Sequence, residues 1–120
     1  MSKKFVYVVD DDDFTRNLIV KMLNKNMECD VACFTGGDEL LASLEGAEKL
    51  PDIIISDIRM PTGNGLRLKG TLEEMELDIP IIYITALDGP ELIEDDLVIL
   101  SKPINQKSLI KKIEELLGSE

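Results

Sequence analysis

The most informative absence from this 120-residue sequence is histidine, which does not occur at all. Without an imidazole, the chain has no Ser-His-Asp or Cys-His mechanism and cannot carry a phosphohistidine of its own. Cysteine is also scarce, with only Cys29 and Cys33. Two thiols four residues apart, in one predicted strand and the residues that lead into it, provide neither a disulfide framework nor a complete set of metal ligands. We expect both to behave as small apolar residues, buried as free cysteines usually are.

Long apolar runs and flexible linkers are also absent. The longest apolar runs have four to five residues, too few to cross a membrane, and the N-terminus does not resemble a signal peptide. No stretch rich in proline, glycine and serine divides the chain. We therefore expect one soluble, cytoplasmic domain over residues 1–120, with no membrane association and no output domain in this chain.

Positive charge is in deficit. The sequence has 13 lysine and arginine residues against 24 aspartate and glutamate residues, a formal net charge of −11. This charge opposes the counterion release that drives nucleic-acid binding, so we expect no direct contact with DNA or RNA.

Short apolar segments that predict strands alternate with segments of helical periodicity. Strands are predicted at residues 5–9, 30–34, 52–56, 81–84 and 98–101. This alternation predicts an α/β fold, a three-layer doubly wound domain with a five-stranded parallel sheet in the flavodoxin-like order 2-1-3-4-5. Only eleven residues, Ala86 to Asp96, lie between Thr85 and the start of the last strand near Leu97, so the fourth helix is predicted to be shortened or missing.

The helix ends carry recognisable signals. Asp12 or Asp13 is a candidate N-cap for a first helix whose apolar positions are Phe14, Leu18, Ile19, Met22 and Leu23. The segment from Thr35 to Asp38 resembles a capping box. A third helix is predicted around Leu66 to Met75, and a last one begins after Asn105 and stops at Gly118.

Four predicted strands each end in a residue suited to phosphoryl chemistry. These are Asp10-Asp11, Asp57, Thr85 and Lys102. Because parallel strands end at one edge of a sheet, we expect these side chains to converge there. Three neighbouring carboxylates repel one another unless a cation compensates them, and oxygen ligands favour Mg²⁺ or Mn²⁺ over Zn²⁺.

This set of groups fits phosphoryl transfer. A metal, an ammonium and a hydroxyl around one carboxylate can neutralise the equatorial oxygens and hold a nucleophile in line. Asp57 is the predicted nucleophile, forming an acyl phosphate, because it stands alone at the end of a central strand. Asp10 and Asp11 form the predicted metal pair, while Lys102 and Thr85 provide a charge and a donor for the product.

At this point the sequence resembles the receiver domain of two-component response regulators over essentially its whole length. The resemblance rests on four strings in order: Val8-Val-Asp-Asp-Asp12 with Arg16, Ile54-Ile-Ser-Asp-Ile-Arg-Met-Pro61 with Gly65, Ile84-Thr-Ala86, and Ser101-Lys-Pro103.

The resemblance implies roles for individual residues. Asp57 would accept a phosphoryl group from a phosphohistidine on a sensor histidine kinase or phosphotransfer protein, or from a small acyl phosphate. Asp11, Asp57 and the backbone carbonyl of Arg59 would bind Mg²⁺, with Asp10 acting through water. Thr85, the backbone N–H of Ala86 and Lys102 would hold the phosphoryl oxygens, and the Lys102-Pro103 bond would be cis. The chain would be an autocatalytic phosphoacceptor that switches a surface for an unknown downstream protein, and not a turnover enzyme.

One position departs from the family. An aromatic residue usually stands three residues before the lysine, where this sequence has Ile99. Isoleucine is stiff at χ1 and carries no hydroxyl. A pseudo-receiver, which binds proteins without switching, therefore remains the alternative function. An aspartyl-nucleophile hydrolase is a third possibility, although its usual Asp-x-Asp pair is absent around Asp57.

Overall fold

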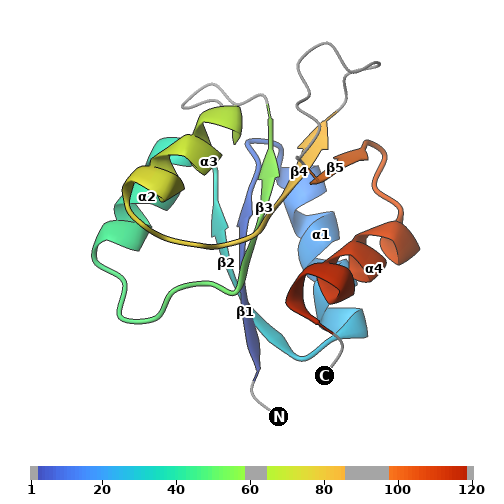
Figure 1. Ribbon diagram of the computed structural model, residues 1–120. Helices are drawn as coiled ribbons and strands as arrows, with labels where there is room; N and C mark the ends of the chain where they lie inside the picture. The colour runs from blue at the N-terminus through green and yellow to red at the C-terminus, as the bar shows by residue number, and fades with distance from the viewer. Residues whose placement is uncertain (1–2, 59–64, 86–97, 119–120) are drawn as a thin grey trace.

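The computed structural model describes residues 3–58, 65–85 and 98–118. In these residues a five-stranded parallel sheet lies between two layers of helices (Figure 1). The strands are β1 (Lys4–Val9), β2 (Cys29–Phe34), β3 (Ile53–Asp57), β4 (Ile81–Thr85) and β5 (Val98–Ser101). Their order is β2-β1-β3-β4-β5, with every neighbouring pair parallel. The predicted α/β fold and strand order are confirmed.

Four helices cover the sheet within the described residues. They are α1 (Asp13–Asn26), α2 (Gly37–Glu45), α3 (Gly65–Glu74) and α4 (Gln106–Leu117). One face of the sheet carries α1 and α4, whose buried side chains share a core with β1, β3 and β4. The other face carries α2 and α3. Because both faces are covered, β3 is buried at all five positions, as its unbroken apolar sequence predicts.

The helix ends in the structure agree with those predicted from the sequence, except at the start of α2. Asp12 caps α1, accepting hydrogen bonds from the backbone N–H groups of Phe14 and Thr15. Asn105 caps α4 by accepting from the N–H of Ser108, and Gly118 follows that helix with φ of 79°. The capping box predicted at Thr35 is wrong. The N-cap of α2 is Gly36, without a side-chain hydrogen bond.

The reason is that α2 starts one residue later than predicted. Thr35 stands before the N-cap and uses its backbone N–H to bond the Glu39 carboxylate at 3.1 Å.

Two burial expectations fail, both for geometric reasons. Phe14 is 74% exposed, because at roughly 100° per residue it lies well away from the buried stripe of Thr15, Ile19, Met22 and Leu23. Cys33 is exposed and Cys29 is only half-buried. Both stand on β2, which lies at one edge of the sheet and has a neighbouring strand on one side only.

The predicted short or missing helix between β4 and β5 falls in residues 86–97, outside the described residues. Among the helices that the structure describes, none is long and apolar enough to span a membrane.

Candidate functional site

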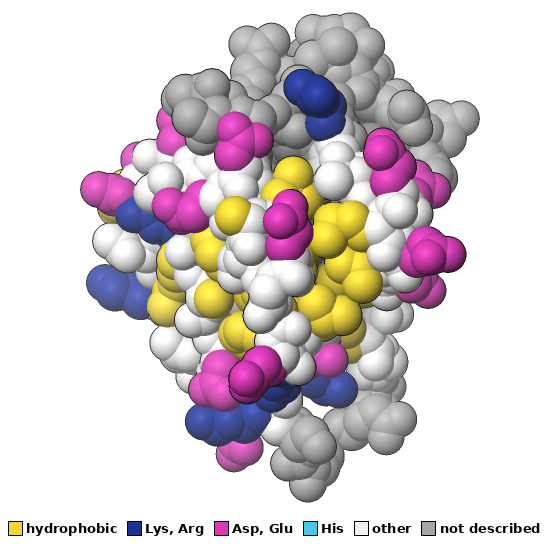
Figure 2. Space-filling model, turned by 90° about the vertical axis from the view of Figure 1, so that its left-hand side faces the viewer, with side chains coloured by type: hydrophobic (Ala, Val, Ile, Leu, Met, Phe, Trp, Pro, Cys, Tyr) yellow, Lys and Arg dark blue, Asp and Glu magenta, His cyan; other side chains and the backbone are white. Residues whose placement is uncertain are grey.

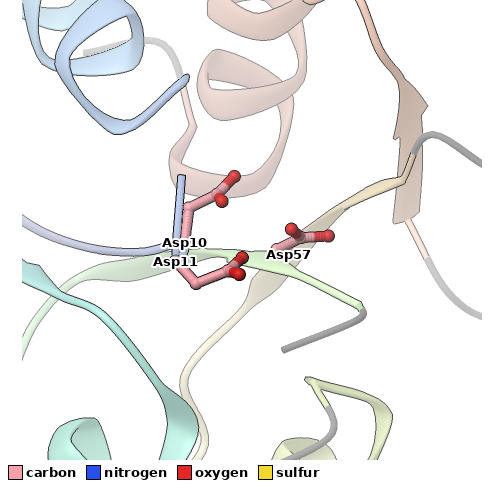
Figure 3. A group of neighbouring side chains, drawn as sticks. All are labelled: Asp10, Asp11 and Asp57. Carbon is pink, nitrogen blue, oxygen red and sulfur yellow. The ribbon is translucent and has the colours of Figure 1, made fainter. Parts of the chain in front are cut away.

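Three carboxylates meet at the carboxyl ends of two central strands. Asp10 and Asp11 follow β1, and Asp57 is the last residue of β3. The strands are direct neighbours, with Val9 paired to Ser56, so the residues that follow also lie side by side. One oxygen from each of Asp10, Asp11 and Asp57 lies within 4.8 Å of the others (Figure 3). This is the topological switch point of the sheet, where doubly wound folds bind ligands.

The burial of these carboxylates is uneven. Asp10 is 1% exposed and Asp57 is 7% exposed, whereas Asp11 is open to solvent. The cluster therefore has a buried floor and an accessible rim, which suits an ion that keeps part of its water shell.

The loop after β1 is held by hydrogen bonds of its own aspartates. The N–H of Asp12 donates to Asp10 Oδ1 at 2.8 Å. The carboxylate of Asp12 accepts from the N–H of Phe14 and from both the N–H and the hydroxyl of Thr15. The hydroxyl of Thr15 is the main cause that lowers the pKa of Asp12. Asp12 thus anchors the loop to α1 and stays ionised, while Asp10 and Asp11 point toward Asp57.

Arg16 fixes the same loop from the first turn of α1. Its Nη1 donates to the backbone carbonyl of Asp10 at 2.8 Å, and its Nη2 pairs with the Asp13 carboxylate. The contact to a carbonyl holds the peptide between Asp10 and Asp11, from which both carboxylates project. Arg16 belonged to the sequence motif, but no role was predicted for it. Its position could have indicated a role, because Arg16 lies in the first turn of a helix that begins close to Asp10.

Lys102 brings an ammonium to the cluster from the far side. Its Nζ lies 3.2 Å from Asp57 Oδ2 and 3.4 Å from Asp10 Oδ2. The strand end that carries it is fixed by a 2.8 Å bond from the Lys102 N–H to the Thr85 carbonyl. The Lys102-Pro103 peptide is cis, as the family resemblance implied.

Burial and charge raise the pKa values of two groups for different reasons. Burial is the largest cause that raises the pKa of the Asp10 carboxyl, with the negative charge of Asp57 adding to it, against the Asp12 N–H and Lys102. Burial alone would lower the pKa of the Lys102 ammonium, but the carboxylates of Asp57 and Asp10 outweigh it and raise that pKa. Lys102 is therefore held charged, while burial makes the Asp10 carboxyl harder to ionise than an ordinary aspartate.

The residues present fit a hard divalent cation. Asp10 Oδ2 is buried and accepts no hydrogen bond from the described residues, so its only compensation there is the ammonium of Lys102. Three carboxylates with one ammonium leave two negative charges. All the donor atoms are oxygens, which suits Mg²⁺ or Mn²⁺.

The structure thus brings together Asp10, Asp11, Asp57 and Lys102, the side chains that the strand ends predicted. Thr85 is the last residue of β4, the strand beside β3, and is 4% exposed. Arg59 and Ala86, whose backbone groups the resemblance implied as ligands, lie outside the described residues.

The fold and the site define a flavodoxin-like domain with a carboxylate cluster at its switch point. Residues 6–114 match the model of the response regulator receiver domain. The chain is 38% identical over 87 residues to the DNA-binding transcriptional regulator NtrC of Salmonella typhimurium, covering 72% of this chain and 18% of that protein. It is 32% identical over 127 residues to the alkaline phosphatase synthesis transcriptional regulatory protein PhoP of Bacillus subtilis, covering 98% of this chain and 49% of that protein. The chain thus spans half or less of the length of these relatives.

Solved structures agree with this match. The receiver domain of the Francisella response regulator 1452 has 27% identity and a TM-score of 0.81, covering 96% of this chain and 97% of that one. The response regulator receiver protein from Sinorhizobium medicae is 21% identical with a TM-score of 0.84, covering 98% of this chain and 97% of that one. The chain belongs to the response regulator receiver domain family of two-component signalling.

Proposed function

We propose that this domain receives a phosphoryl group on Asp57 in a Mg²⁺-dependent reaction and thereby switches a protein-binding surface. The observation that carries the proposal is the ammonium of Lys102, 3.2 Å from the Asp57 carboxylate, in a cluster with two further carboxylates. If Lys102 and Asp57 formed only a structural ion pair, two further carboxylates beside it would serve no purpose.

In the proposed reaction an oxygen of Asp57 attacks the phosphorus of the donor. The new bond is the P–O bond of an acyl phosphate. The bond that breaks is P–N in a phosphohistidine or P–O in a small acyl phosphate, and its electron pair leaves with the imidazole nitrogen or the carboxylate oxygen. A sensor histidine kinase or phosphotransfer protein is the proposed donor, because this chain has no histidine of its own.

The other side chains hold charge in place. Asp10, Asp11 and Asp57 would bind Mg²⁺ or Mn²⁺, with the carbonyl of Arg59 as the family's remaining protein ligand. When bound, the ion supplies positive charge that offsets the charge of the phosphoryl oxygens. Lys102 would move from sharing Asp10 and Asp57 to pairing with the phosphoryl group, and Thr85 would donate its hydroxyl to a phosphoryl oxygen. The phosphoryl group would stay on Asp57, so the domain would act as a phosphoacceptor and not as a turnover enzyme.

Intact-mass measurement tests the proposal. The protein is treated with acetyl phosphate and Mg²⁺ beside an Asp57→Asn variant. We expect a labile gain of one phosphoryl group in the parent alone. No adduct in the parent, even with a phosphorylated kinase as donor, would contradict the proposal.

A pseudo-receiver is the second candidate, and Ile99 favours it. Ile99 is half-buried on β5, beside the buried ring of Tyr83 on β4. A stiff β-branched side chain in this place cannot swing between an inward and an outward position as a flat ring does. Amide hydrogen exchange of β5 with and without beryllofluoride separates the two candidates. Altered exchange at Ile99 supports switching, and unchanged exchange with the ligand bound supports the pseudo-receiver.

We further propose that residues 1–120 form one receiver domain acting in the cytoplasm, where a kinase's phosphohistidine would be available. No direct role for nucleic acid is proposed, because the charge of −11 opposes it.

A further inference from the structure

The α2–α3 side of the molecule carries apolar residues that the described chain leaves partly open to solvent. Leu41 of α2 and Met75, Leu77 and Ile79 of the segment that follows α3 are only partly buried, although all four pack against the core beneath these helices. We call these four residues the α2–α3 strip. Figure 2 shows hydrophobic side chains gathered on this face of the molecule.

Leu50 extends the apolar surface from the loop before β3. It is 41% exposed, one of two large hydrophobic residues exposed in the described chain. Residues before and after Leu50 in this loop contact Phe5, which packs on the same core. Lys49 Nζ lies 5.5 Å from the centre of the Phe5 ring, and the N–H of Asp52 donates to the Phe5 carbonyl at 2.7 Å. These contacts hold the loop against the core, so Leu50 is exposed at a fixed position.

An acidic rim surrounds this apolar surface. Residues 37–50 and 65–79 carry three basic residues and eight exposed acidic ones, which are Asp38, Glu39, Glu45, Glu48, Glu73, Glu74, Glu76 and Asp78. None of the eight forms an ion pair with any part of the chain that the structure describes. Ion pairs among the described residues thus leave the negative charge of these eight side chains in place.

The opposite helix layer has the reverse balance. Helices α1 and α4 together carry six basic residues against three acidic ones, and two of their acids are paired, Asp13 with Arg16 and Glu115 with Lys112. The two segments that carry the apolar strip are therefore acidic on balance, whereas α1 and α4 are basic on balance. An apolar centre with a polar, mainly acidic rim is typical of a recognition surface.

We propose that the α2–α3 strip with its acidic rim is a docking surface for a partner protein, which presents an apolar segment flanked by lysine or arginine. Apolar side chains of the partner would cover Leu41 and Met75, and its cations would pair with the rim. The occupant follows from charge complementarity, since a second copy of this chain would bring the same acids face to face. The surface lies away from the carboxylate cluster, because α2 and α3 run back from the strand ends that carry it.

A peptide selection tests the proposal without assuming the charge of the partner. A random library of phage-displayed peptides is selected on the whole chain, and the enriched peptides are synthesised and titrated. We expect peptides of net positive charge with two or three large apolar residues. Their NMR footprint should centre on α2, α3 and Leu50, and Leu50→Ser should weaken their binding.

Charge-reversal variants provide the matched control. Glu45→Lys with Glu73→Lys changes the rim, whereas Glu28→Lys with Glu114→Lys changes exposed acids elsewhere by the same charge. We expect the rim pair to weaken binding by about tenfold and the control pair by less than about twofold. Folding of each variant is checked by thermal unfolding.

Four results would overturn the proposal. They are enrichment of acidic or uncharged peptides, no enrichment at all, equal weakening by both charge-reversal pairs, and a footprint on the Asp10–Asp57 rim. Self-association through the strip in sedimentation experiments would also count against it. The proposal does not rest on phosphotransfer, so Asp57→Asn should bind the peptides as the parent does.

Discussion

Replacement of Lys102 by methionine should make the stability of the domain depend strongly on Mg²⁺. The ammonium is the one cationic side chain that contacts the carboxylate cluster within the described residues, at 3.2 Å from Asp57 and 3.4 Å from Asp10. Methionine keeps the length of the side chain and removes its charge. Without the ammonium, the metal-free fold must hold three carboxylates together unaided.

The distances give the size of the effect. At an effective dielectric constant of about 20, the two contacts of Lys102 are worth about 10 kcal/mol of attraction. The three repulsions between carboxylates no more than 4.8 Å apart amount to at least about 10 kcal/mol. The two sums nearly cancel, so Lys102 holds the metal-free cluster close to balance. Since Lys102 and Asp11 both reach solvent, screening and rearrangement should leave a measured loss of about 1–3 kcal/mol.

The assay is urea unfolding of parent and Lys102→Met at fixed pH and ionic strength, with and without excess Mg²⁺. We expect the variant to be less stable without the ion and to recover most of the difference when Mg²⁺ is added, because the metal offsets the same repulsion. Lys112→Met is the matched control, since Lys112 pairs with Glu115 on the surface of α4. A loss for Lys102→Met that is equal with and without Mg²⁺, or no loss at all, would refute the electrostatic reasoning.

Three further predictions concern single residues. Because the pKa of Asp10 is raised in the folded state, the metal-free protein should gain stability relative to Asp10→Asn as the pH falls from 7 toward the ordinary carboxyl value of 3.8. Urea unfolding at several pH values checks this, and a parent that loses stability relative to Asp10→Asn toward low pH contradicts it. Gly70 is exposed inside α3 with open space where a Cβ would lie, so Gly70→Ala should raise the free energy of unfolding by about 0.5–1 kcal/mol, whereas Gly46→Ala at the end of α2 should change it little. Arg16→Ala should weaken Mg²⁺ binding by about tenfold through loss of the contact to the Asp10 carbonyl. Asp13→Asn leaves that contact intact and is the control. Isothermal titration compares the two variants, and equal Mg²⁺ affinities would show that the contact does not position the cluster.

The site was predictable from the sequence because it depends on strand ends. Once parallel strands and their order are inferred, the residues after β1 and at the end of β3 must meet, whatever the details of packing. The positions of Asp10, Asp11, Asp57 and Lys102 follow from this rule alone.

What the sequence did not reveal depends on contacts between elements. Phe14 shares helical spacing with the core residues of α1, but its burial depends on how the helix is rotated over the sheet. The exposure of Cys33 depends on the place of β2 at an edge of the sheet, where it has a neighbouring strand on one side only. The contact of Arg16 with a backbone carbonyl leaves no trace in residue type, because any arginine could equally lie in solvent.

The account's central claim is that Asp57 itself carries the phosphoryl group and needs the cation to receive it. Reduction of the acetyl phosphate-treated protein with borohydride converts an aspartyl phosphate to homoserine, and peptide mass spectrometry locates that residue. We predict homoserine at position 57 in the presence of Mg²⁺, little or none when the ion is chelated, and a sharp reduction in Asp11→Asn. Homoserine at Asp10 or Asp11, or equal labelling of Asp57 without the ion, would contradict the account.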